Sequence, residues 1–333
     1  MKSRLSIIYI IAVCFSVLII THVYSFVRQP ASPPEAVKLE IEPGSSAWEI
    51  SKKLQEHGII SDYATFMVVA VVTGKFSHLQ AGTYVFEGVH YPLDIMGILF
   101  QGKTLRYKIT VPEGSDIFDI ADIVAATGLI SKETFIHIAT SKDSAQFFGI
   151  EAPSLEGYLY PDTYFLAANM TPLEIMAKMI NRFKHIYALE IQQKYQNPDF
   201  SLLEIITLAS IIEKEAAKPD EKPIISSVFH NRLKKNMKLQ SDPTAIYGID
   251  NFDRDILHKD LERDSPYNTY RYKGLPPGPI CNPGKDSIAA AIRPKQTSYL
   301  YFVSKGDRTH AFSKTLREHN RVILIYRKKP DKR

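Results

Sequence analysis

Two stretches of this chain repeat each other: VKLEIEPGSSAWEISKKLQEHGIIS at residues 37–61 and YKITVPEGSDIFDIADIVAATGLIS at residues 107–131. Each copy opens with apolar and polar residues in alternation, which predicts strands over Val37–Ile41 and Tyr107–Val111. A Gly-Ser turn follows, then a helix that stops at a glycine and a second helix that begins at a serine. The matched positions are Gly44 and Gly114, Ser45 and Ser115, Trp48 and Phe118, Ile50 and Ile120, Gly58 and Gly128, Ile60 and Ile130, Ser61 and Ser131.

The repeat sets the predicted domain organisation. Residues 37–105 are expected to form one small α/β module, and residues 106–150 a partial second copy of it within a larger α+β domain at 106–333. Two copies are too few for a solenoid. Trp48 and Phe118 fall at helix positions that are usually buried, which favours a packing module over a carbohydrate-binding one.

The N-terminal region predicts a membrane anchor. No charged residue lies between Arg4 and Arg28, so Leu5–Val27 is an apolar stretch long enough to cross a bilayer. A cleavable signal peptide is the competing interpretation, but the stretch ends without a small-x-small cleavage site. Lys2 and Arg4 predict that residues 1–4 stay in the cytoplasm and that the chain after residue 28 lies outside. The Pro-rich residues 28–36 are expected to act as a semi-rigid linker.

The composition excludes several classes of protein. The 333 residues carry 41 Lys+Arg and 36 Asp+Glu, a formal charge of +5. Lys2 and Arg4 belong to the flank of the anchor, so the remainder is nearly balanced and no nucleic acid is expected as a partner. The two cysteines, Cys14 and Cys281, exclude a disulfide framework. No zinc-ligand spacing, phosphate-binding loop or nucleophile elbow occurs, so we expect neither a metal nor a cofactor.

Three further helices are expected, at Pro172–Ile186, Leu202–Ala217 and Ile224–Lys234, and two strands at Tyr299–Val303 and His310–Phe312. The second helix, SLLEIITLASIIEKEAA from Ser201, starts with a capping box and has a wide apolar arc. Glu213 and Glu215 both project from that arc. A buried carboxyl group either finds a partner or has its pKa raised, and a raised pKa suits a general acid. The residues alone leave open whether this is a structural pair or a catalytic site.

Polar side chains in and after the next helix are candidates for a carbohydrate groove, because amides, hydroxyls and tyrosines bind sugar hydroxyls and stack on sugar rings. The candidates are Asn231, Gln240, Asp242, Tyr267, Asn268 and Thr269. The alternative is plain turn chemistry. A hydrolytic glycosidase needs two carboxyl groups across one bond. Glu213 and Glu215 diverge by roughly 160° on a helix, which leaves Asp242 as the second acid.

Several motifs resemble those of the YceG-like endolytic murein transglycosylases, also called the MltG family. The resemblance covers the whole chain in order, including the anchor. The motifs are Glu156-Gly-Tyr-Leu-Tyr-Pro-Asp-Thr-Tyr164, Ala209-Ser-Ile-Ile-Glu-Lys-Glu215, Val228-Phe-His-Asn-Arg-Leu233, Leu239-Gln-Ser-Asp-Pro-Thr244, Tyr267-Asn-Thr-Tyr270, Gly274-Leu-Pro-Pro-Gly-Pro-Ile280 and His319-Asn320.

The resemblance implies an enzyme that cleaves the MurNAc–GlcNAc β-1,4 bond in nascent peptidoglycan and terminates strand elongation. The C6 hydroxyl of the sugar is the nucleophile, so 1,6-anhydro-MurNAc ends form and one carboxyl group suffices. By analogy with other lytic transglycosylases this is Glu215, which a small residue follows, with Glu213 as the second choice. Gln240, Tyr267, Asn268 and Thr269 would line the groove.

The resemblance also implies a LysM-like module at 37–105 that binds glycan, a single-pass protein of the cell inner membrane, and penicillin-binding synthases as candidate partners. Two other hypotheses stay open. One is a non-catalytic peptidoglycan-binding scaffold, and the other is a hydrolytic muramidase that uses Glu215 with Asp242.

Overall fold

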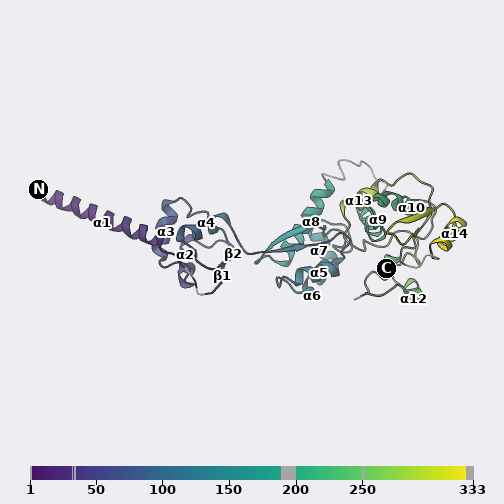
Figure 1. Ribbon diagram of the computed structural model, residues 1–333, viewed down its shortest axis with the longest axis horizontal. Helices are drawn as coiled ribbons and strands as arrows, with labels where there is room; N and C mark the ends of the chain where they lie inside the picture. The colour runs from purple at the N-terminus through teal and green to yellow at the C-terminus, as the bar shows by residue number, and fades with distance from the viewer. Residues whose placement is uncertain (1, 32, 34, 189–199, 250–251, 328–333) are drawn as a thin grey trace. The chain divides into compact units, whose positions relative to one another are not determined.

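The computed structural model describes residues 2–31, 33, 35–188, 200–249 and 252–327 (Figure 1). Its contacts divide the chain into two compact units. The first runs up to Tyr107 and includes Phe165–Met170; the second comprises Lys108–Tyr164 and the chain from Thr171 onward. Residues 165–170, which the sequence places in the larger domain, therefore pack with the smaller unit.

The first unit has the order α1 (Lys2–Arg28), β1 (Val37–Ile41), α2 (Ala47–Glu56), α3 (Tyr63–Val72), β2 (Gly82–Phe86) and α4 (Pro92–Gln101). Strands β1 and β2 are antiparallel, with Leu39 opposite Tyr84. Both of these side chains are buried in a core that the helices complete. The α/β character predicted for this region is confirmed, and β1 has its predicted bounds.

Helix α1 is long and apolar enough to cross a membrane, with a mean hydropathy of 2.4 over its most apolar window. Its last turns nevertheless belong to the core of the first unit, because Phe26 is buried there and Val23 and Val27 pack against it. The backbone of Ala31 pairs with that of His90. Ala31, within the stretch predicted to be a linker, is therefore paired with a residue of the first unit.

The repeat of this pattern and the elements after it are β3 (Arg106–Thr110), α5 (Ile117–Ala125), α6 (Lys132–Ala139), α7 (Lys142–Phe147), β4 (Thr163–Ala167) and α8 (Pro172–Ile186). The helices belong to the second unit, and β3 and β4 each have residues in both units. Strand β3 begins one residue before its predicted position and pairs with β4. The two copies agree in their caps, since Ser46 and Asp116 each begin a helix with a capping box. Helix α8 has its predicted bounds.

The repeat differs from the prediction at its aromatic position. Trp48 is 51% exposed and packs edge-on against Tyr63, whereas Phe118 is half-buried. The expectation that both residues belong to the core was wrong, because the helix turns this position toward solvent.

The rest of the second unit surrounds α9 (Leu202–Glu215). Residues 205–212 are all buried, including Thr207 and Ser210 on the side expected to be polar, because α10 (Lys222–Lys234) and α13 (Lys285–Ile292) pack on the helix. The remaining elements are η2 (Pro219–Glu221), α11 (Asp242–Ile246), α12 (His258–Leu261), β5 (Tyr301–Ser304), β6 (His310–Ser313) and α14 (Leu316–Arg327). Strands β5 and β6 form an antiparallel hairpin close to the predicted positions.

Gly157, which follows Glu156, lies against Ile206 of α9 and against Pro279. We predict that Gly157→Ala destabilises the second unit strongly. Its φ is +88°, and a Cβ atom would lie 2.6 Å from Cγ of Pro279 and 2.7 Å from Cγ2 of Ile206. The left-handed backbone costs roughly 1–2 kcal/mol with a side chain and overpacking a further 1–3 kcal/mol. Thermal unfolding measures the loss. The control is Gly128→Ala, with φ +73° and open space around it; an equal loss in both variants would contradict the packing argument.

Candidate active site

The end of α9 carries Glu213 and Glu215 out of the core of the second unit. The helix stops at Glu215, two residues before its predicted end, because Ala216 is extended, with ψ 110°. The chain must turn here, since Lys218 precedes a proline and is held out of the helical region. The two carboxyl groups consequently leave the helix near its last turn and enter different surroundings.

Glu213 is held in an ion pair. The Nζ atom of Lys222 lies 3.0 and 3.2 Å from its two carboxylate oxygens, and the backbone N–H of Gly284 donates to it at 2.9 Å. The Glu213 and Lys222 side chains are 8% and 5% exposed. This is the structural alternative left open by the sequence, with Lys222 as the partner.

Part of the Glu215 residue is exposed, but its carboxyl group lies away from water and has no cation within ion-pair distance in the part of the chain that the structure describes. Its carboxyl accepts a 2.6 Å hydrogen bond from the hydroxyl of Ser241. Burial raises the pKa of Glu215 to about 7, assisted by the negative charge of Asp242 and opposed by the Ser241 hydrogen bond and by Arg232. The carboxyl group is therefore balanced between its protonated and ionised forms near neutral pH.

Ser241 is oriented by a turn that contains an uncommon backbone conformation. Gln240 is exposed and has φ +49°, a left-handed value that is infrequent for residues other than glycine. Its N–H donates to the carbonyl of Thr269, and the N–H of Ser241 donates to the hydroxyl of Thr269. Thr269 is buried and also bonds to Thr244. Thr269 thus acts as part of the support for Ser241, and its side chain is closed to a ligand.

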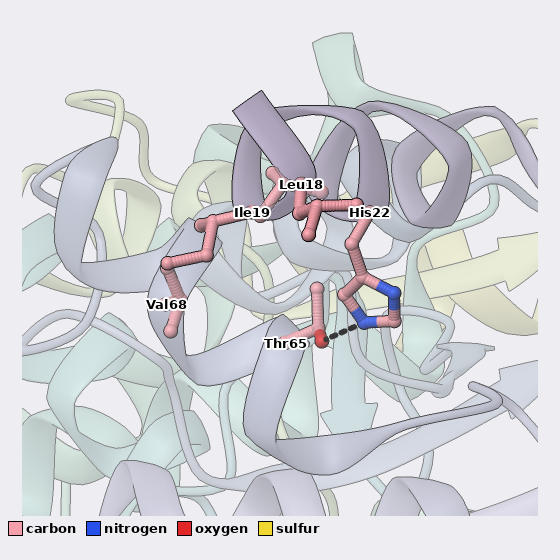
Figure 2. A pocket seen from close by; sticks show the side chains of 6 residues that line it. Leu18, Ile19, His22, Thr65 and Val68 are labelled. Atoms are coloured by element: carbon pink, nitrogen blue, oxygen red, sulfur yellow. Dashed lines mark hydrogen bonds between the residues drawn. The ribbon is translucent and has the colours of Figure 1, made fainter. Parts of the chain in front are cut away.

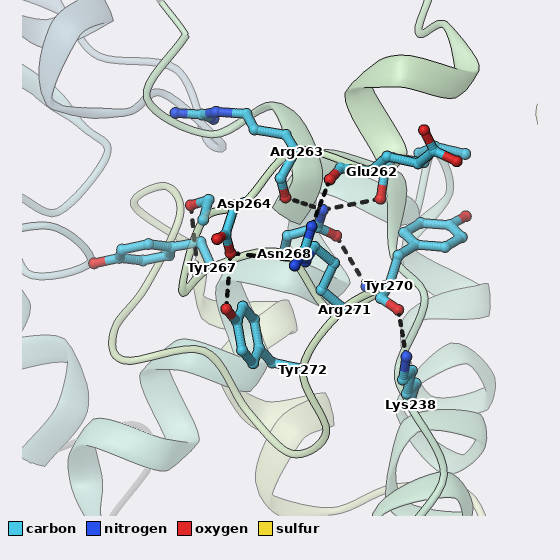
Figure 3. A network of polar contacts seen from close by, with 11 residues as sticks. Lys238, Glu262, Arg263, Asp264, Tyr267, Asn268, Tyr270, Arg271 and Tyr272 are labelled. Atoms are coloured by element: carbon cyan, nitrogen blue, oxygen red, sulfur yellow. Dashed lines mark hydrogen bonds and ion pairs between the residues drawn. The ribbon is translucent and has the colours of Figure 1, made fainter.

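Asn268 supports the neighbouring loop, shown in Figure 3. It is fully buried, its amide donates to the carbonyls of Leu261 and Arg263, and its oxygen accepts from the N–H of Tyr270. The same loop is held at Lys238, whose ammonium donates to the carbonyl of Tyr270 at 2.9 Å. The prediction that Asn268 lines a groove conflicts with this burial, because its polar atoms are used inside the loop.

Asn231 also serves the scaffold. Its amide donates to the carbonyls of Thr297 and Tyr299 at 2.9 Å each, which fixes the segment before β5 to α10. The adjacent Arg232 donates to the carbonyls of Leu300 and Leu239. The hydrogen bond from Arg232 to Leu239 connects α10 to the Gln240 turn. Asn231 and Arg232 therefore hold in place the backbone that surrounds Glu215.

Asp242 and Tyr267 remain accessible. Asp242 is exposed at the start of α11 and accepts a hydrogen bond from the hydroxyl of Tyr270. The half-buried ring of Tyr267 packs on Tyr247 with centroids 4.7 Å apart. Of the six predicted groove residues, Gln240, Asp242 and Tyr267 are thus open to a ligand, whereas Asn231, Asn268 and Thr269 are engaged in the scaffold.

A groove of about 740 Å³ lies next to this corner of the second unit. Lys214 and Pro243, the chain neighbours of Glu215 and Asp242, both line it. Asp116, Asp119 and Asp122, from the start and the exposed face of α5, also line it. The groove is open and its lining mixes polar and apolar side chains, as a sugar chain requires for its hydroxyl groups and for its ring faces.

Glu156 carries another buried carboxyl group. The sequence places Glu156 in a family motif and predicts no catalytic or binding role for it. It accepts hydrogen bonds from the N–H of Ile117, the hydroxyl of Tyr247 and the amide of Asn282. Burial raises the pKa of Glu156 to about 8. Since Glu156 is 1% exposed, we assign it to the framework that joins the start of α5 to the segments of Tyr247 and Asn282. Within the described ranges no group of three or more His, Cys, Asp or Glu residues is placed to hold a metal ion.

These features define an α+β protein with a candidate acid–base site at the end of a buried helix, beside an open groove. The chain belongs to the YceG-like family, whose model matches residues 39–324. It is 36% identical to the endolytic murein transglycosylase of Bacillus subtilis, over 87% of this chain and 84% of the relative. The corresponding protein of Streptococcus pneumoniae strain R6 is 28% identical, and the match covers 84% of this chain and 57% of that protein.

A solved structure supports the fold as well. The crystal structure of a putative YceG-like protein from Listeria monocytogenes is 34% identical to this chain and superposes with a TM-score of 0.58. The match covers 86% of this chain and 99% of that one.

Proposed function

We propose that this chain is an endolytic lytic transglycosylase that cleaves the MurNAc–GlcNAc β-1,4 bond of nascent peptidoglycan and so terminates strand elongation. Family membership and the 36% identical relative support the reaction class. The observation that carries the assignment of the catalytic residue is the contrast between the two glutamates: Glu213 is locked in an ion pair, while Glu215 has no cation partner among the described residues and has a pKa raised to about 7.

In this mechanism Glu215 acts first as an acid. Its protonated carboxyl donates to the glycosidic oxygen as the bond from that oxygen to C1 of MurNAc breaks. The carboxylate then accepts the proton of the C6 hydroxyl, whose oxygen bonds to C1 and forms the 1,6-anhydro ring. The proton count closes without water, and Glu215 returns to its starting form. Ser241 orients the carboxyl, and Gln240, Asp242 and Tyr267 contact the glycan.

The test is mass analysis of peptidoglycan digested by the purified full chain in detergent. Anhydro-muropeptides released from the interior of strands support the proposal. Reducing-end products would instead indicate the hydrolytic muramidase with Asp242 as second acid. Binding to peptidoglycan without any product would indicate the scaffold.

The pH dependence of cleavage offers a second prediction. Because the acid step needs protonated Glu215, we expect kcat/KM to fall as pH rises through about 7. Asp242 raises this pKa, so Asp242→Asn should move the descending limb to lower pH. The Ser241 hydrogen bond lowers it, so Ser241→Ala should move the limb to higher pH. Shifts of the same sign in both variants would contradict this account of the site.

We further propose that α1 anchors the protein in the cell inner membrane with the N-terminus in the cytoplasm and both units outside. The charges of Lys2 and Arg4 support that orientation. The order β1-α2-α3-β2 supports a LysM-like glycan-binding role for residues 37–105. Glycan strands are then the main partner, and penicillin-binding synthases that make them are candidate protein partners. Protease protection of the intact chain in spheroplasts tests the orientation.

A further inference from the structure

Helix α3 differs from its neighbour α2 in what it exposes. The outward face of α2 carries Glu49, Lys52 and Glu56, as expected for a helix on a water-exposed surface. The stretch from Tyr63 to Gly74 contains no charged residue at all. A helix that is apolar on every side is normally found inside a protein core or in contact with a membrane.

One side of α3 is covered by the core of the first unit, through Phe66, Val69 and Ala70. The opposite side is a continuous apolar surface made of Ala64, Val68, Val71 and Val72. Their spacing of i, i+4, i+7 and i+8 places them on one face of the helix. These three valines are 48%, 57% and 81% exposed. We call this surface the valine face.

The valine face is continuous with the apolar helix α1. Figure 2 shows Val68 and Thr65 of α3 facing α1 across a shared pocket. The Nε2 atom of His22 lies 3.0 Å from the hydroxyl of Thr65, so the polar atoms at this junction bond to each other. The lining residues are Leu18, Ile19, His22, Val23, Thr65 and Val68.

The position of this junction along α1 determines its depth in a bilayer. Residues 5–17 are the part of the apolar stretch that precedes the junction, and 13 residues of helix are about 20 Å long. The hydrocarbon core of a bilayer is about 30 Å thick. The last third of the hydrocarbon must therefore be crossed by the part of α1 that carries the junction. A shift of α1 toward the outside would free the junction from the hydrocarbon only by drawing Lys2 and Arg4 into it.

We propose that the valine face of α3 is immersed in the acyl chains of the leaflet at the carboxyl-terminal end of the span. The lipid covers Val68, Val71 and Val72, which removes from water the apolar surface that the protein leaves open. Arg28 ends α1 and lies over the ring of Tyr24, and Lys75 follows α3 by three residues and lies over the ring of Phe100. Tyrosine is enriched at membrane–water interfaces, and long basic side chains near helix ends reach out to the headgroups. The first unit is then fixed against the membrane surface on two helices.

This inference rests on the proposed anchoring by α1, so the test includes a reference position in α1. The full chain carries Cys14→Ala, because Cys14 is exposed, whereas Cys281 is buried and closed to labelling. Val72→Cys, Val13→Cys and Lys52→Cys are each labelled with a nitroxide and reconstituted in vesicles of phosphatidylcholine and phosphatidylglycerol. All three positions are exposed, so the substitutions leave the core intact. Collision with oxygen is compared with collision with a water-soluble nickel chelate.

We expect the oxygen-to-nickel accessibility ratio at residue 72 to exceed that at residue 52 several-fold, and the ratio at residue 13 to be higher still. A ratio at residue 72 equal to that at residue 52, with a lipid-like value at residue 13, would overturn the inference and leave the anchor in place. Aqueous values at all three positions would overturn the anchor as well. The two failures are therefore distinguishable.

Discussion

Glu215→Gln is expected to lower the rate of glycan cleavage by roughly 10²–10⁴-fold, the usual contribution of a general acid. Glutamine has nearly the shape of glutamic acid and accepts the Ser241 hydrogen bond, but its amide N–H is far too weak an acid to protonate the glycosidic oxygen, and the neutral amide is too weak a base to take the proton of the C6 hydroxyl. The measurement is the initial rate of anhydro-muropeptide release, with the melting temperature of the variant as a check on folding.

Glu213→Gln is the matched control, two residues away on the same helix. It weakens the contact with Lys222, so the melting temperature is expected to fall. The rate of glycan cleavage, measured well below that temperature, is expected to change little. Full activity in Glu215→Gln together with loss of activity in a folded Glu213→Gln variant would transfer the catalytic role to Glu213 and refute our assignment.

Lys222→Met is expected to destabilise the second unit by roughly 3–5 kcal/mol, because it leaves the Glu213 carboxylate buried without its cation. The same substitution at Lys234, which is exposed near the other end of α10, should change the free energy of unfolding by less than about 0.5 kcal/mol. Urea denaturation of the full chain, monitored by circular dichroism, gives both values.

A double variant separates the ion pair from simple loss of packing. Adding Glu213→Gln to Lys222→Met removes the unpaired charge, so part of the lost stability should return. Simple addition of the two single losses would show that the pair has no coupling energy and that the carboxylate finds another partner.

Much of the local structure could be predicted from the sequence, because it is set by neighbours in the chain. Helix α8 and strand β1 have their predicted bounds. The offset repeat corresponds to equivalent turns, with φ of +85° at Gly44 and +81° at Gly114. The capping box of Ser201 and Glu204 was also recognised correctly, since its partners are three residues apart.

The two glutamates show where such reasoning stops. The helical pattern indicates that Glu213 and Glu215 both leave an apolar helix, and it cannot distinguish them. The distinction comes from Lys222, nine residues along the chain, and from Ser241, which a turn supported by Thr269 brings to Glu215. For the same reason the sequence did not reveal that Asn231 and Asn268 are engaged with carbonyl groups of distant loops.

By itself, then, the sequence determined the α+β class, the repeat, the apolar N-terminal helix and the resemblance to the YceG-like family, all of which depend on periodicity, caps and motifs read along the chain. Only the tertiary structure decided which carboxyl group is paired and which is open, and that the end of α1 is part of the first unit's core. The pKa of a carboxyl group and the burial of a side chain depend on groups that folding brings near in space, and spacing along the chain does not record those distances.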